Sequence, residues 1–151
     1  MINKFFFFLM VLSLANCGYQ PIYSKKNILD LPIREINLMG NKNIGRQIIP
    51  LLNLNTQNGK DSKYSLQLTS DTKVQTVAKN RSGTASVYNT TMNVILTLHE
   101  GEQKIKEKTF NQSFTYNNIK NKFDLSQYQR NIEINLVDKI SSEISIFLNT
   151  M

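Results

Sequence analysis

Residues 64–79 read YSLQLTSDTKVQTVAK, and this stretch decides the fold because its apolar and polar side chains alternate. The apolar members share one parity: Tyr64, Leu66, Leu68, Val74 and Ala78. A period of two places the two sets on opposite faces of a β-strand. The sequence therefore predicts a long strand with one face turned towards a core and the other towards water.

Two more strands are predicted downstream of this one. The turn-forming cluster at residues 80–83 leads into a second alternating run, whose inward parity holds Tyr88, Met92, Val94, Leu96 and Leu98. After a tight turn at residues 100–102, a third run over residues 103–116 puts one set of aromatic side chains on a single face: Phe110, Phe114 and Tyr116. Ile105 lies on the opposite parity, which indicates either a β-bulge or a slipped start of the strand.

Upstream of residue 64, the chain predicts a short strand and a short helix. Residues 32–40 alternate, with Ile36 and Leu38 on the apolar side, and end at Gly40. Residues 43–55 carry apolar side chains at helical spacing, with Asn43 as the expected N-cap. Pro50 removes a backbone donor and costs about 3 kcal/mol inside a helix, so this helix is expected to be kinked or short.

The C-terminal part predicts a long amphipathic helix. Asp124 and Gln127 have the spacing of a capping box. The apolar stripe behind them consists of Leu125, Tyr128, Ile132, Leu136, Ile140, Ile144 and Phe147. The order β-α-β-β-β-α predicts an α+β domain in which two helices pack on one face of a four-stranded, mostly antiparallel sheet. The other face is expected to stay polar and wet, or to meet a partner.

The N-terminus has the organisation of an export signal. Lys4 precedes the apolar run 5–12, and Leu14-Ala15-Asn16-Cys17 resembles a bacterial lipobox, although Asn16 departs from the usual small residue. The run is too short and too interrupted for a membrane-spanning helix. We expect a removed signal peptide (residues 1–16), an acylated tether that begins at Cys17 (residues 17–31) and one domain (residues 32–151).

The composition argues against most catalytic and metal sites. Cys17 is the only cysteine and His99 the only histidine, so thiolate zinc sites and internal disulfides are excluded. The remaining catalytic hypothesis is an envelope hydrolase that uses His99. A lone histidine at a strand end is far more often a surface residue, so we expect no enzyme, no metal and no cofactor.

The formal net charge of +7 allows two interpretations. The lysines are either solvated surface residues in a chain rich in Asn, Lys and Ile, or part of a patch that attracts an anionic partner. Behind a lipoprotein signal, a phosphorylated lipid is a more plausible anion than nucleic acid. The best local basic feature is the turn with Lys79 and Arg81, although these two cations also suit the simpler role of blunting a strand end.

The run Cys17-Gly18-Tyr19-Gln20-Pro21-Ile22-Tyr23 resembles the start of the LptE family of LPS-assembly lipoproteins in its short alphaproteobacterial form. The order of strands and turns is similar over nearly the whole mature chain. The resemblance implies a protein that is lipid-anchored at the outer membrane and faces the periplasm and the barrel lumen. There it would plug the LptD-type β-barrel, assist its assembly and bind lipopolysaccharide during delivery to the cell surface.

The same resemblance implies candidate lipopolysaccharide-binding residues. Arg81 matches the family's basic contact position in the turn before the strand that carries Tyr88, and Lys79 flanks it. Lys122, in the segment before the last helix, is the nearest match to a second basic position. The partners implied are the barrel, the lipid A phosphates and, through the acyl chains on Cys17, the membrane. The alternative is a structural envelope lipoprotein without a lipid ligand.

Overall fold

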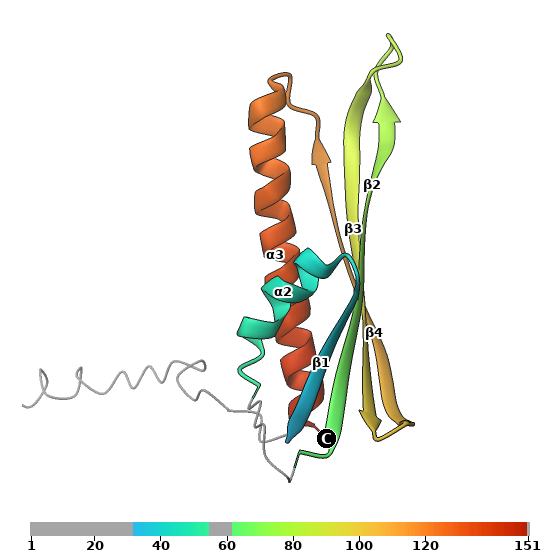
Figure 1. Cartoon of the computed structure of the whole chain (residues 1–151). Helices are drawn as coiled ribbons and strands as arrows, with labels where there is room; N and C mark the ends of the chain where they lie inside the picture. The colour runs from blue at the N-terminus through green and yellow to red at the C-terminus, as the bar shows by residue number, and fades with distance from the viewer. Residues whose placement is uncertain (1–31, 55–61, 151) are drawn as a thin grey trace, which may run out of the picture.

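The computed structural model describes residues 32–54 and 62–150 of the chain. The elements in these residues are β1 (Ile33–Gly40), α2 (Lys42–Leu51), β2 (Tyr64–Lys79), β3 (Ala85–Glu100), β4 (Gln103–Asn117) and α3 (Lys122–Asn149) (Figure 1). The predicted α+β class and its β-α-β-β-β-α order are confirmed. The predicted signal peptide (residues 1–16) and acylated tether (residues 17–31) lie outside the described residues.

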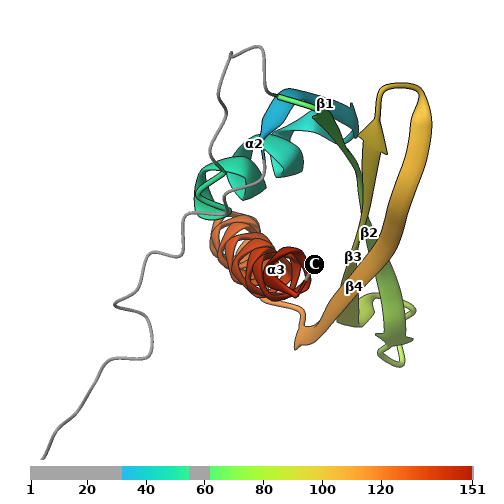
Figure 2. The ribbon, with the colours of Figure 1, turned by 90° about the horizontal axis from the view of Figure 1, so that it is seen from below.

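The four strands form one mixed sheet in the order β1-β2-β3-β4. β2, β3 and β4 are antiparallel neighbours, whereas β1 runs parallel to β2, with α2 in the connection between them. Both helices lie on the same face of the sheet, as the view along the strands shows (Figure 2). The core between the two layers contains, among others, Ile44, Ile48, Leu66, Leu68, Met92, Leu96, Phe110, Leu136, Ile140 and Ile144.

Bulges interrupt the regular pairing of the strands, and two of them bear on predicted side-chain directions. Arg34 is an extra residue in the pairing of β1 with β2, so Ile33 and Ile36 both turn inward despite their odd spacing. A second register shift, opposite Leu98 and His99, leaves Ile105 of β4 unpaired. The bulge interpretation of Ile105 is therefore correct.

The structure corrects both predicted helix caps. Asn41, not Asn43, caps α2, and its side chain accepts a hydrogen bond from the backbone N–H of Asn43 at 3.2 Å. The helix ends at Leu51, one residue after Pro50, so it is short. Asn121, not Asp124, caps α3, which begins one turn before the predicted capping box.

Gly40 forms the corner between β1 and α2. Its φ of +69° is in the left-handed region, and a Cβ there would lie 2.3 Å from the carbonyl oxygen of Ser70. That same carbonyl accepts a hydrogen bond from the N–H of Asn41 at 2.7 Å, and the Ser70 hydroxyl donates to the Asn41 carbonyl at 2.8 Å. The predicted end of the first strand at Gly40 is thus explained by a close approach between two backbones.

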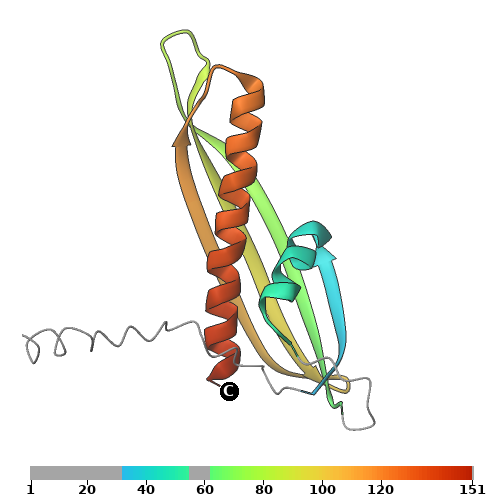
Figure 3. The same ribbon diagram turned by 90° about the vertical axis from the view of Figure 1, so that its left-hand side faces the viewer.

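The helices cover the sheet unevenly. α3 runs along its whole length, whereas β1 and α2 lie beside only the half that is lower in Figure 3. β1 stops opposite Ser70, so Val74 of β2 has no neighbouring strand on that side and is 51% exposed. Phe114 of β4 is 41% exposed and Tyr128 of α3 is 39% exposed. These three side chains were predicted to be inward-facing, and they are not in the buried core.

Candidate functional site

The hairpin between β2 and β3 holds Arg81 in a well-defined turn. The N–H of Asn80 donates to the Thr84 carbonyl at 2.8 Å, and the N–H of Gly83 donates to the Asn80 carbonyl at 3.0 Å. Gly83 has a φ of +80°, so the loop is a type I turn that closes through a left-handed glycine. The Asn80 side-chain oxygen also accepts from the N–H groups of Ser82 and Thr84 at 3.1 and 2.9 Å. The backbone that carries Arg81 is therefore fixed, while the side chains of Arg81 and Lys79 are exposed.

Lys122 is the first residue of α3, which corrects its predicted place in the segment before that helix. The Asn121 side chain accepts a hydrogen bond from the N–H of Phe123 at 2.9 Å and so fixes the start of the helix. A helix N-terminus carries a partial positive charge, so a lysine there destabilises the helix by about 0.3–1 kcal/mol. A bound anion at this position would remove that cost.

The hairpin and the start of α3 lie at the same end of the molecule (Figures 1 and 3). Asn118 ties them together, because its N–H donates to the Ser86 carbonyl at 2.8 Å and its side-chain amide donates to the Ala85 carbonyl at 2.7 Å. We call residues 79–84 together with residues 118–124 the cationic tip. The structure thus places Lys79, Arg81 and Lys122 at one end of the fold.

The cationic tip has an excess of positive charge. It contains Lys79, Arg81, Lys120 and Lys122 but only one carboxylate, Asp124. Within residues 32–54 and 62–150, the one ion pair is Lys104–Glu107 at 3.3 Å, so no cation of the tip is neutralised by a described carboxylate. Lys120 is not among the binding residues predicted from the sequence, although its position two residues before Lys122 indicates a basic segment.

Three tyrosines in contact support the tip from the helix-facing side of the sheet, one pair with tilted rings and the other edge to face. Tyr116 of β4 packs against Tyr88 of β3 and Tyr128 of α3, with ring centroids 5.7 and 5.8 Å apart. The Tyr116 hydroxyl accepts hydrogen bonds from the Gln129 amide at 2.8 Å and from the Thr90 hydroxyl at 3.3 Å. The prediction that the inward tyrosines belong to the core holds for the buried Tyr116, and the three rings connect β3, β4 and α3 below the tip.

A second group of lysines has a structural explanation. The Lys108 ammonium lies 4.7 Å from the ring centroid of Phe147 and 5.1 Å from that of Phe110, and the Lys106 ammonium lies 5.4 Å from that of Phe147. These contacts are cation–π interactions near the C-terminus of α3, where the helix dipole also favours positive charge. This pair of lysines is therefore already partnered, unlike the cations of the tip.

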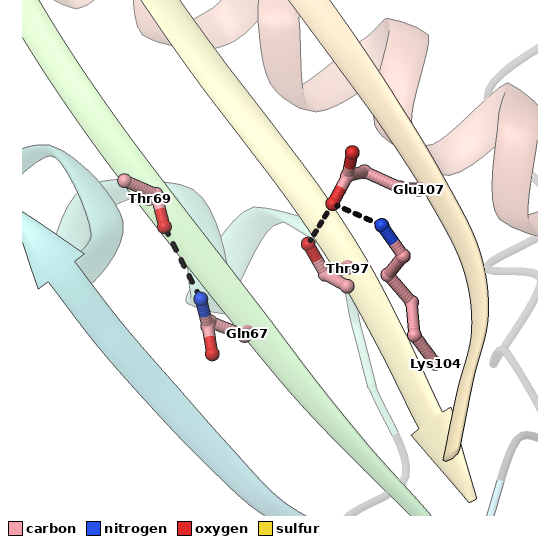
Figure 4. Close-up of polar contacts among 5 residues, drawn as sticks. All are labelled: Gln67, Thr69, Thr97, Lys104 and Glu107. Atoms are coloured by element: carbon pink, nitrogen blue, oxygen red, sulfur yellow. Dashed lines mark hydrogen bonds and ion pairs between the residues drawn. The ribbon is translucent and has the colours of Figure 1, made fainter.

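The face of the sheet opposite the helices is polar, as predicted. Figure 4 shows part of it: Glu107 accepts hydrogen bonds from the Thr97 hydroxyl and from the Lys104 ammonium, both at 3.3 Å. Further along this face, Asn89 bonds Thr115 at 2.9 Å. Neighbouring side chains of this face thus satisfy one another across the strands.

His99 lies on the same polar face, near the turn between β3 and β4. The register places Ser65 and Lys104 opposite it on the two neighbouring strands, and neither of these described side chains hydrogen-bonds His99. In the described part of the chain, no group of three or more His, Cys, Asp and Glu side chains is placed to hold a metal ion. None of the helices in that part is long and apolar enough to span a bilayer.

The arrangement of a long-stranded sheet with two helices on one face is also found in several bacterial lipoproteins of known structure. The chain superposes on the minor lipoprotein of Acinetobacter baumannii with a TM-score of 0.62 and 12% identity, over 80% of this chain and 92% of that one. It superposes on rare lipoprotein B of Shewanella oneidensis with a TM-score of 0.53 and 13% identity, over 77% of this chain and 98% of that one. No family model and no curated protein sequence matches the chain.

Proposed function

We propose that this protein is a non-enzymatic, lipid-anchored lipoprotein of the outer membrane. In this proposal it plugs and helps to assemble an LptD-type β-barrel and binds lipopolysaccharide during delivery to the cell surface. The observation that carries the proposal is the cationic tip, where Arg81 on the hairpin and Lys122 at the start of α3 share one end of the fold. The fold shared with bacterial lipoproteins and the resemblance of residues 17–23 to LptE support the same assignment.

Lipid A is phosphorylated, and the tip offers the groups that phosphates prefer. The Arg81 guanidinium can bind a phosphate with two parallel hydrogen bonds, and lysine ammonium groups act as point charges. The N–H groups at the start of α3 add a partial positive charge beside Lys122. Such contacts are stronger in a partly shielded barrel lumen than in open water.

Exposed apolar side chains next to the cations favour an amphiphile over a soluble anion. Phe123, beside Lys122, is 69% exposed, and Val77, two residues before Lys79, is 60% exposed. When an acyl chain covers large apolar side chains that are this exposed, the free energy of the system falls. An exposed apolar residue thus lies close in sequence to a cation both beside the hairpin and at the start of α3, which fits a phosphate that is attached to fatty acids.

The polar face of the sheet fits a position inside a large barrel. The lumen of an outer-membrane barrel is lined by polar side chains and water. A plug in that environment needs a polar outer surface, and the Asn, Gln, Ser and Thr side chains of this face, including Asn89, Thr97 and Thr115, provide one.

The lipid-binding part of the proposal is tested by titrating purified protein with labelled lipopolysaccharide at low and high salt. Charge reversal at both Arg81→Glu and Lys122→Glu should weaken binding by at least about tenfold, because a hydrogen bond to a charged group contributes about 1.5–3 kcal/mol. Each reversal is also made singly and compared with Lys139→Glu, which makes the same charge change on exposed α3 surface roughly 25 Å from Lys122 along the helix. Equal binding by the charge-reversed variant and the control would leave the structural lipoprotein without a lipid ligand as the better description.

The barrel part of the proposal is tested separately by depleting the protein in cells. The level of the LptD-type barrel and the amount of surface lipopolysaccharide should both fall, and the barrel should co-purify with the tagged protein. Unchanged barrel levels after depletion would contradict this role whatever the result of the lipid titration.

A further inference from the structure

A shallow apolar hollow lies between β1 and α2, at the edge of the sheet farthest from β4. It has a volume of about 290 Å³ and is lined by Ile36 and Leu38 of β1 and by Arg46, Ile49 and Pro50 of α2. We call it the β1 hollow. It belongs to the half of the molecule that is opposite the cationic tip in Figure 1, so the proposed lipid site does not account for it.

A close contact between the two elements lies beside this hollow. A Cβ at Gly45 would lie only 2.7 Å from Leu38 Cδ2, so α2 rests directly on the strand at this point. Ile36 and Leu38 both point to the helix side and are half-buried. Their remaining exposed surface faces the hollow instead of a neighbouring strand.

The hollow adjoins an open edge of the sheet. β1 pairs with β2 on one side, and in residues 32–54 and 62–150 no strand pairs with its other side. Every second N–H and C=O of such an edge strand points outward and can hydrogen-bond an added strand. A bound acyl chain would fill the hollow but would leave these backbone groups without protein partners.

The size of the hollow matches the side chains of an added strand. A cavity of about 150 Å³ holds a group as large as benzene, so the β1 hollow holds about two medium-sized side chains. On a strand, two side chains on the same face are about 6.6 Å apart, which is also the spacing of Ile36 and Leu38.

The charges around the hollow favour an acidic occupant. α2 carries Lys42 and Arg46 and has no carboxylate. Within the described part of the chain, the Arg46 guanidinium donates a single long hydrogen bond, to the Asn43 side-chain oxygen at 3.4 Å. A carboxylate on an added strand would complete its hydrogen bonding.

We propose that the free edge of β1 accepts a fifth strand from a partner protein. That strand places two apolar side chains in the β1 hollow and a carboxylate against Arg46. This is recognition by β-strand addition, in which backbone hydrogen bonds give affinity and side-chain pockets give specificity. The inference does not depend on lipid binding at the tip.

The test uses the mature protein and a synthetic peptide as long as the eight residues of β1. In the peptide, valine and threonine alternate, and one glutamate lies on the valine face. One control peptide carries lysine instead of glutamate, and another is N-methylated at alternate backbone amides so that one edge cannot pair. Binding is measured by fluorescence anisotropy, and amide hydrogen exchange of β1 reports whether its free edge becomes bonded.

The glutamate peptide should bind, protect amides of β1 from exchange and lose binding on N-methylation. Replacing glutamate by lysine should weaken binding by about fivefold, since an exposed charge pair contributes up to about 1 kcal/mol. The Arg46→Glu variant should reverse that preference, whereas Arg130→Glu, an exposed arginine on α3, should leave it unchanged.

Three results would overturn the proposal. They are no binding of the glutamate peptide, equal binding of the N-methylated peptide, and an unchanged preference in Arg46→Glu. Saturation of the hollow by dodecyl phosphate without any protection of β1 amides would also overturn it, because the hollow would then be a lipid site.

Discussion

Replacing Gly40 by alanine should destabilise the fold far more than the same replacement at Gly101. Both glycines have a left-handed φ, +69° and +61°, so alanine at either position costs about 1–2 kcal/mol in backbone strain. At Gly101 no heavy atom lies within 4 Å of the added Cβ, whereas at Gly40 the Cβ would meet the Ser70 carbonyl oxygen at 2.3 Å. The corner must then open, and the two hydrogen bonds between Ser70 and Asn41 are lost, at about 1 kcal/mol each.

The expected loss of unfolding free energy is thus about 3–4 kcal/mol for Gly40→Ala and about 1–2 kcal/mol for Gly101→Ala. Urea unfolding followed by far-ultraviolet circular dichroism measures both. With a denaturant slope of about 2 kcal/mol per molar, the two midpoints should differ by about 1 M. Alanine also lowers the conformational entropy of the unfolded chain, which raises the unfolding free energy. This effect is the same in both variants, so it does not change the difference between their midpoints. Equal midpoints would refute the close approach at Gly40 as the reason for the glycine.

Three further outcomes are expected. Tyr116→Phe removes the hydroxyl that accepts from Thr90 and Gln129, so it should lower the unfolding free energy by about 1–3 kcal/mol in the same urea assay; a neutral result would mean that neither bond matters. His99→Ala should leave stability within about 0.5 kcal/mol and cellular lipopolysaccharide assembly intact, and loss of a hydrolytic activity in this variant would instead favour the enzyme hypothesis. Cys17→Ser should abolish the incorporation of labelled palmitate, and labelling that persists would contradict the assignment of Cys17 as the acylated residue.

The element types were predictable because they rest on local periodicity. The alternation in residues 64–79 and 85–98 and the stripe from Leu125 to Phe147 each gave the correct element and the correct inward face for the central residues. The caps were less predictable, because each helix start offers two suitable residues close together. Asn121 and Asp124 can both cap α3, and the choice depends on where the chain leaves β4, which is a tertiary feature.

The burial of individual side chains was predicted less well than the face of the sheet to which they point. Val74 and Phe114 lie on the parity expected to face inward, and both are exposed. Whether an inward-facing side chain is covered depends on how far β1 and α2 extend along the sheet, and periodicity within β2 or β4 contains no information about that distance. Arg81 could be proposed as a binding residue from its local turn sequence. That it lies at the same end of the molecule as Lys122 depends on the tertiary fold, which the local pattern does not contain.

The parallel pairing of β1 with β2 also has a consequence for the order in which the chain acquires structure. β2, β3 and β4 form a meander whose contacts are joined by short turns, and such local contacts form early in folding. β1 precedes the other described strands in the chain, yet its only neighbour among them begins at Tyr64, beyond α2. The pairing of β1 therefore needs a later part of the polypeptide, and we expect β1 with α2 to dock last and to open first under mild denaturation.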